Sequence, residues 1–256
     1  MQWVVPTFHP AHILRKNRRL EGLLKHDLKR AVGLANGSWR PRWNESSTGY
    51  IMRPTADQVV ETLAAMHGTE VAYDIETDGQ HPMLGQIRCI GFWNGRVGIC
   101  VPWLFRDGTT HEVTVVDKKG KKKLKTIPVW KKYFSGDALK RVNKAIQALF
   151  TRATKLDTQN GQYDRVCLKS RMGFNIPSAE LPNFDTIIGH HVVASYLNHG
   201  LDLLTSIYTD MPYYKKTEEG EAWSTSNDRE LWLYCLRDCE STWLCAQKLR
   251  QEITER

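Results

Sequence analysis

The sequence lacks the marks of a membrane-spanning, secreted or zinc-binding protein. No apolar run in its 256 residues approaches the ~20 residues that a helix needs to cross a bilayer. The first residues, Met1–Pro6, have neither the basic head nor the long apolar core of a signal peptide. The six cysteines show no CxxC spacing, which argues against a zinc module and a disulfide scaffold. We therefore expect a protein of the reducing cytoplasm that does not associate with a membrane.

Acidic residues are outnumbered by basic ones. Lysine and arginine total 36 against 28 aspartates and glutamates, which gives a formal net charge of +8 and a pI near 9.2. General solubility would explain the total, but the positive charge is clustered, chiefly in residues 12–35 and 118–132. A clustered positive charge favours a polyanionic partner, and nucleic acid is the natural candidate.

One short stretch, VAYDIETDG over residues 71–79, carries two closely spaced acids. Side chains on a strand alternate between its faces, so Asp74 and Glu76 project from one face and Tyr73 and Ile75 from the other. Two carboxylates in one small volume repel each other unless a cation lies between them, and oxygen ligands suit Mg²⁺ or Mn²⁺. The stretch alone fits a metal site or a strand end with solvated acids.

The first half of the chain divides into a basic segment, a linker and a series of strands. Leucines at helical spacing predict an amphipathic basic helix within 12–35, after a short strand at 4–5. Residues 36–52 show no periodicity and predict a linker. Thr55 is a candidate N-cap for a helix that ends near Met66. Strands are then expected at 71–79, 86–93 and 96–103, with a tight turn at Asn94-Gly95, as an antiparallel meander.

Two strand-forming runs, 113–116 and 124–129, flank a basic, glycine-containing turn. This pattern predicts a protruding hairpin, with seven lysines between Lys118 and Lys131. The tip is either a solvated loop or a mobile grip for nucleic acid, because lysines neutralise phosphates without fixed geometry.

The second half is mostly helical. A helix is expected at 136–152, a strand at 155–159, a turn at Asn160-Gly161, a helix at 163–172 and a last helix at 229–254. Strands first, then helices alternating with a strand, predict a layered α/β domain with a mixed sheet.

Further acids appear at two later points. Asp164 stands at a helix start, and Tyr234 and Asp238 lie four residues apart on one face of the last helix. In order, the patterns DxE, NxxYD and YxxxD resemble the three exonuclease motifs of the DEDD superfamily. The tyrosine branch fits, since the other branch needs a histidine where Leu233 stands, and the proofreading domain of family A DNA polymerases is most similar. The segments 184–186 and 200–204 resemble that family's link between its second and third motifs.

The resemblance implies a ribonuclease-H-like mixed sheet flanked by helices, with a small N-terminal strand-helix appendage, and two divalent ions, Mg²⁺ or Mn²⁺. Asp74, Glu76 and Asp238 would bind the first ion. Asp74 and Asp164 would bind the second, Asp164 through water, and Tyr234 would orient the attacking water. We expect the nucleic acid to be contacted by Thr77, Asn160, Tyr163, Lys118, Lys119, Lys121, Lys122 and Lys123.

The implied activity is a metal-dependent 3′→5′ exonuclease that releases 5′-mononucleotides from single-stranded or frayed 3′ ends of DNA. Eighteen residues follow Asp238, too few for a polymerase domain. We therefore expect a free-standing exonuclease, viral and in the host cytoplasm, or one half of a split polymerase with a separate polymerase subunit. The alternatives are a catalytically idle nucleic-acid-binding or polymerase-accessory module and an exoribonuclease of the same superfamily.

The N-terminal residues 6–15 and 27–28 are similar to the end of bacterial-type uracil-DNA glycosylases. Glycosylase activity is not expected, because the family's upstream water-activating motif is absent and every cysteine lies at or after Cys89. We expect a glycosylase-like remnant with a basic helix at 1–35, a linker at 36–53 and the exonuclease domain at 54–256.

Overall fold

The computed structural model describes residues 5, 7–16, 20–41, 49–79, 81–116, 120–177, 183–212, 214 and 228–255. Lys118 and Lys119, two of the expected nucleic-acid contacts, lie outside these ranges. Among the described helices, none combines the length and the apolar character needed to cross a membrane.

A six-stranded mixed sheet with strand order β1-β4-β3-β2-β7-β8 forms the centre of the fold. The strands are β1 (Tyr50–Ile51), β2 (Glu70–Thr77), β3 (Ile87–Trp93), β4 (Gly98–Pro102), β7 (Lys155–Thr158) and β8 (Asn183–Asp185). β2, β3 and β4 form the expected antiparallel meander, whereas β7 and β8 continue the sheet in parallel on the other side of β2. The prediction of a mixed sheet is confirmed.

The turn between β3 and β4 follows from its first two residues, Asn94 and Gly95. Gly95 has a φ of +87°, which an L side chain rarely adopts. The side-chain oxygen of Asn94 accepts hydrogen bonds from the backbone nitrogens of Arg96 and Val97 at 3.2 and 3.0 Å. The sequence pair therefore forms a self-stabilised turn that sets the register of the two strands.

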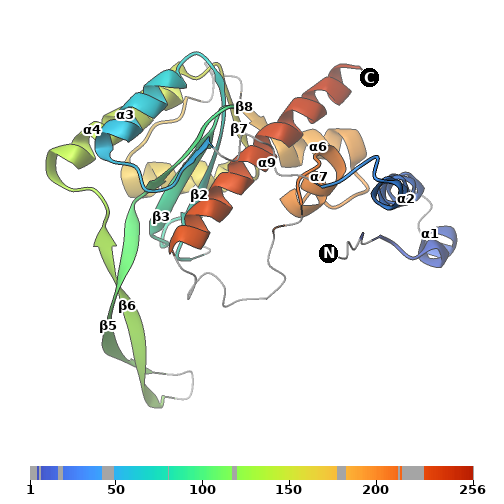
Figure 1. Ribbon diagram of the computed structural model, residues 1–256. Helices are drawn as coiled ribbons and strands as arrows, with labels where there is room; N and C mark the ends of the chain where they lie inside the picture. Colours follow the sequence, from blue (N-terminus) through green and yellow to red (C-terminus); the bar gives the residue numbers. More distant parts are fainter. Residues whose placement is uncertain are drawn as a thin grey trace.

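Helices cover both faces of the sheet (Figure 1). α3 (Ala56–Ala65) and α4 (Gly136–Arg152) lie on one face, and the long α9 (Asp228–Thr254) crosses the other. Thr55 caps α3 as expected, in a reciprocal capping box with Gln58. The face toward α3 and α4 holds the main core, to which β2 contributes Tyr73 and Ile75. Asp74 and Glu76, which alternate with Tyr73 and Ile75 along β2, consequently face α9.

α9 approaches β3 closely enough to require glycine at Gly91. A Cβ there would lie 2.7 Å from the Cys239 sulfur and 2.8 Å from the Cys235 sulfur. α6 (Thr186–Ala194) and α7 (Leu201–Tyr208) pack beside α9 through a smaller cluster that includes Leu204 and Leu249. Thus α9 is held between the sheet and a helical layer.

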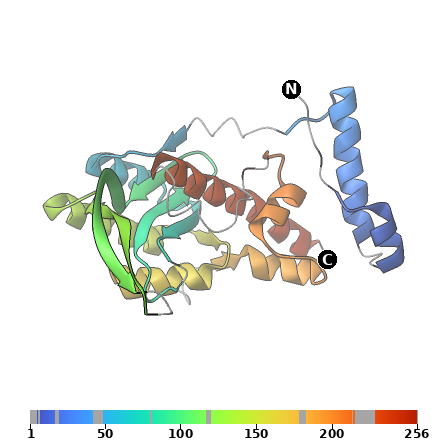
Figure 2. The same cartoon turned by 90° about the horizontal axis from the view of Figure 1, so that it is seen from below.

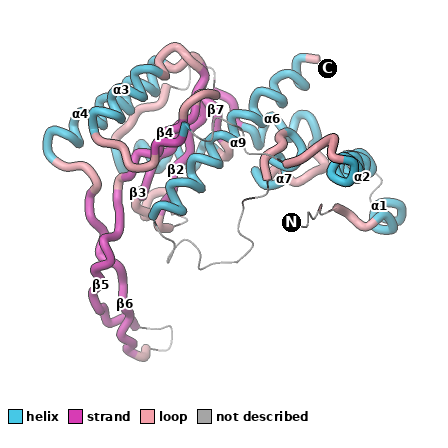
Figure 3. Tube along the Cα trace, in the orientation of Figure 1, coloured by secondary structure: helices cyan, strands magenta, loops and turns pink. Residues whose placement is uncertain are grey.

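The basic hairpin is longer than the sequence pattern indicated. β5 (Leu104–Val116) and β6 (Lys122–Lys132) pair along most of their length as a separate two-stranded sheet. A strand of 13 residues extends about 40 Å, and Figures 1 and 3 show the hairpin projecting away from the main sheet. Its far part is largely exposed.

The N-terminal segment differs from expectation in three ways. It forms two helices, α1 (Pro10–Lys16) and α2 (Glu21–Asn36), instead of one, and Val5 is not in a strand. Leu28, one of the leucines at helical spacing, is 51% exposed, because α2 lies against the other described parts of the chain along one side, at the end remote from the hairpin (Figure 2). The linker prediction is wrong at its end, since Tyr50–Ile51 pairs in parallel with β4 as the edge strand.

Candidate active site

Asp74 and Glu76 lie on β2 and face α9, as the period-two pattern predicted. One carboxylate oxygen from each of them and the sulfur of Cys235 lie within 4.8 Å of one another. The Cys235 thiol also donates a hydrogen bond to the backbone oxygen of Asp74 at 3.6 Å. The two acids are therefore fixed side by side between a rigid strand and a rigid helix.

α9 supplies Tyr234 and Asp238 to the same place. The Tyr234 hydroxyl forms a hydrogen bond with the Asp238 carboxylate. Burial raises the pKa of Tyr234 strongly, and the negative charges of Asp238, Glu76 and Asp74 raise it further. The hydroxyl therefore keeps its proton and can act as a donor beside three carboxylates.

Asp164 reaches the site from α5 (Gly161–Cys167), which a short π-helical turn, Leu168–Met172, extends. Asn160, with a φ of +61°, turns the chain out of β7 into α5, and the Asp185 carboxylate accepts hydrogen bonds from the backbone nitrogens of Asn160 and Gly161 at 3.2 and 2.9 Å. Burial raises the pKa of Asp164 to about 8, although backbone N–H groups, with Ile75 first, favour its charged form. Full ionisation of Asp164 at neutral pH thus calls for a nearby cation.

A cleft of about 230 Å³ connects these groups. Its lining includes Asp74, Asp164 and Asp238, from β2, α5 and α9. Two expected nucleic-acid contacts, Asn160 and Tyr163, also line it. The side chains expected to form the site from widely separated parts of the sequence are therefore brought to one location: Asp74, Glu76, Asp164, Tyr234 and Asp238.

The other expected contacts divide into two groups. Thr77 lies beside the cleft, where its hydroxyl is 2.9 Å from the Tyr163 hydroxyl, and both hydroxyls donate to the backbone oxygen of Gly79. Lys121, Lys122 and Lys123 are exposed, lie at the start of β6 beside the end of β5, and do not line the cleft. A nucleic acid would have to extend outward to reach them.

Sequence reasoning missed Tyr214. Its hydroxyl donates a 2.7 Å hydrogen bond to Oδ1 of Asp238, and its ring packs on Tyr234 with centroids 5.9 Å apart. Burial raises the pKa of Tyr214 well above its usual value, and the Asp238 charge adds to this. The residues around Tyr214 carry no periodic pattern, so no local signal marked it.

The donor set fits divalent cations. Carboxylate oxygens are the ligands that Mg²⁺ and Mn²⁺ prefer, and several of them converge here on one small cleft. A buried carboxylate such as Asp164, with its raised pKa, gains most from a positive ion nearby. Among the described residues, an ion of this kind could be held by Asp74, Glu76, Asp164 and Asp238.

Comparison with known proteins places the fold. No protein-family model matches the chain, and no curated protein matches it. Among solved structures, the EXO domain of Aedes aegypti Nibbler is similar, with a TM-score of 0.55 at 10% identity over 84% of this chain and 92% of that domain. Escherichia coli RNase D, described as an exoribonuclease, gives 0.54 at 15% identity over 80% of this chain, which spans 45% of the RNase D chain. Brucella melitensis NrnC gives 0.51 at 16% identity over 75% of this chain and 77% of that one. At these identities the likeness shows the fold alone, and the chain therefore has the ribonuclease-H-like α/β fold of these nucleases.

Proposed function

We propose that the protein is a metal-dependent 3′→5′ exonuclease that releases 5′-mononucleotides from the 3′ ends of DNA. The observation that carries the proposal is the convergence of Asp74, Asp164 and Asp238 on one cleft, with Glu76 and Tyr234 beside it. Three separate parts of the chain supply these groups. The fold shared with RNase D and Nibbler supports the same class of reaction.

Each residue has a distinct part in this proposal. Asp74, Glu76 and Asp238 would hold one divalent ion, and Asp74 with Asp164 the other. When bound, two such ions lower the pKa of a water molecule and stabilise the entering and leaving oxygens of an in-line phosphoryl displacement. Tyr234, protonated and next to Asp238, orients the attacking water. Tyr163 and Asn160 line the cleft where the terminal nucleotide would lie.

An idle binding module is a weaker alternative. Asp164 is 4% exposed, and burial of its carboxylate carries a free-energy cost in the charged form. Clustered carboxylates without a metal repel one another and give nothing to the binding of a polyanion. The clustered acids therefore favour a working metal site.

RNA is the second candidate substrate. RNase D is described as an exoribonuclease, and its fold similarity covers 80% of this chain. The choice depends on contacts near the 2′-hydroxyl of the bound nucleotide. The identity of the acids does not determine it.

The test uses the full chain with 5′-labelled single-stranded DNA, matched duplex and RNA, each with Mg²⁺, Mn²⁺ or a chelator. We expect stepwise shortening of the single-stranded DNA with a divalent ion and none with chelator. Asp74→Ala should abolish shortening and keep the melting temperature, and Asp238→Asn should do the same, because its amide oxygen can still accept from the Tyr214 hydroxyl.

The matched control is Asp137→Ala, which removes an exposed acid on α4, on the opposite face of the sheet. It should leave the rate unchanged. Retained activity in Asp74→Ala would refute the metal-site assignment, and faster shortening of RNA than of DNA would make the protein an exoribonuclease.

A further inference from the structure

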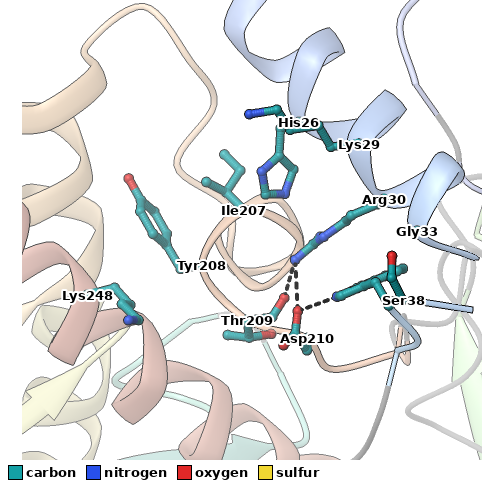
Figure 4. Close-up of a pocket in the computed structure, with 11 residues that line it drawn as sticks. His26, Lys29, Arg30, Gly33, Ser38, Ile207, Tyr208, Thr209, Asp210 and Lys248 are labelled. Carbon is teal, nitrogen blue, oxygen red and sulfur yellow. Dashed lines mark hydrogen bonds and ion pairs between the residues drawn. The ribbon is translucent and has the colours of Figure 1, made fainter.

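A second cavity, of about 480 Å³, lies away from the acidic cleft, between α2 on one side and α7 and α9 on the other (Figure 4). Its walls come from the N-terminal segment and from the nuclease fold. Neither the sequence motifs nor the proposed chemistry accounts for it.

Specific contacts hold the two walls together. Arg30 on α2 donates hydrogen bonds to the backbone oxygens of Ser206 and, at 2.5 Å, Thr209, at the end of α7. The indole nitrogen of Trp39 donates to Asp210 at 2.7 Å, and the Arg30 guanidinium lies 4.9 Å from the centre of the Trp39 ring. The last carbonyls of a helix attract a cation such as the Arg30 guanidinium, so these contacts stabilise the packing of α2 against the end of α7.

The cavity has a net positive charge. Lys29 from α2 lines one wall and Lys248 from α9 lines the other. Both side chains are exposed, and neither forms an ion pair with a described residue. The one acid in the lining, Asp210, is already engaged by Arg30 and Trp39. Burial and the Arg30 charge lower the pKa of His26, which favours its neutral form, so the positive charge of the cavity does not depend on this side chain. Two lysines therefore face the cavity without a counter-charge, which suits an anion.

Two helices, α7 and α9, each extend from the acidic cleft to the cavity. Leu201, the first residue of α7, lines the cleft, and Tyr208, the last, lines the cavity. Eight helical residues span about 10 Å, and the ten positions from Asp238 to Lys248 along α9 span about 15 Å. At ~3.4 Å per stacked nucleotide, these distances correspond to about three or four nucleotides.

We propose that this cavity binds two backbone phosphates of the substrate strand, three and four nucleotides from the end held in the acidic cleft, one at Lys29 and the other at Lys248. The proposal rests on the proposed function for the position of the strand end. The ligand is a single-stranded nucleic acid, and the N-terminal segment is part of the substrate-binding surface.

The test measures binding of fluorescent thymidylate oligonucleotides of 2 and 12 nucleotides to the full chain with Ca²⁺ in place of Mg²⁺, because Ca²⁺ also takes carboxylate ligands. Each oligonucleotide is checked for shortening after the measurement. Lys29→Glu/Lys248→Glu is compared with Lys140→Glu/Lys144→Glu, which makes the same charge change on α4. Each lysine–phosphate pair on a single strand contributes ~0.7 to the slope of log affinity against log salt, so removal of both pairs predicts a slope smaller by ~1.4. With equal affinities at 1 M salt, this slope corresponds to an affinity about 25-fold lower at 0.1 M salt. The dinucleotide should bind all three proteins equally, and the control variant should bind both ligands as the wild type does.

Two results would overturn the proposal. One is unchanged binding of the 12-nucleotide strand by Lys29→Glu/Lys248→Glu, and the other is an equal weakening for the dinucleotide. Free thymidine monophosphate carries the same phosphate, so tight binding of it that disappears in this variant would assign the cavity to a free nucleotide instead. Hydrolysis of the dinucleotide with Mn²⁺ is measured on the same preparations: its absence with the expected binding pattern would refute the nuclease function alone.

Discussion

Removal of the Tyr214 hydroxyl tests whether the buried hydrogen bond to Asp238 supports metal binding. Tyr214→Phe keeps the ring and its packing on Tyr234 but removes the donor that lies 2.7 Å from Oδ1 of Asp238. A hydrogen bond to a charged group contributes about 1.5–3 kcal/mol, which corresponds to about 10- to 100-fold in an equilibrium constant. We therefore expect the metal concentration for half-maximal activity to rise by about this factor, because Asp238 loses the group that fixes its orientation.

The assay is the shortening of single-stranded DNA as a function of Mn²⁺ concentration at saturating substrate. Tyr234→Phe should behave differently: the maximal rate should fall with little change in the half-maximal metal concentration, since Tyr234 orients water. Tyr133→Phe is the control, because the Tyr133 ring packs among aromatic side chains and its hydroxyl has no hydrogen-bond partner among the described residues. If Tyr214→Phe titrates like the wild type and reaches the same rate, the hydrogen bond has no part in holding the metal ligand.

Three further changes have defined outcomes. The triple variant Lys121→Gln/Lys122→Gln/Lys123→Gln should bind long single strands more weakly, with a salt slope smaller by ~0.7 for each phosphate that these lysines neutralise, whereas an unchanged slope would make the hairpin end a solvated tip. Gly91→Ala should lower the free energy of unfolding by about 1–3 kcal/mol in a denaturant titration, because its Cβ would meet two thiols of α9 at 2.7 and 2.8 Å; equal stability would mean that α9 moves without cost. Burial lowers the pKa of His190 below its ordinary value of 6.5, so its stabilising contribution is present above pH 6.5 and is lost as the pH falls through the lower folded-state value. His190→Gln should therefore flatten the decline of melting temperature below pH 6.5, and an unaltered decline would refute this origin.

The sequence determined the parts of the site that depend on local geometry. Asp74 and Glu76 share a strand face because side chains alternate, and Tyr234 and Asp238 share a helix face because they are four residues apart. The turn at Asn94-Gly95 and the capping residue Thr55 have their side-chain partners within three residues. Such interactions need little of the remaining chain, and the structure has them where the pattern placed them.

Contacts between distant segments were decided only by the tertiary structure. Tyr214 contacts Asp238, 24 residues later in the chain, and β1 pairs in parallel with β4, from which β2 and β3 separate it in the sequence. The docking of α2 depends on Arg30, whose partners on the α7 side lie 176 and 179 residues away. A basic residue with helical spacing predicts only an exposed face; which carbonyls it meets depends on the path of the whole chain. Local periodicity thus determined the acids that could share a metal, whereas the packing of α9 and α7 decided which tyrosine supports them and where a second, basic cavity opens.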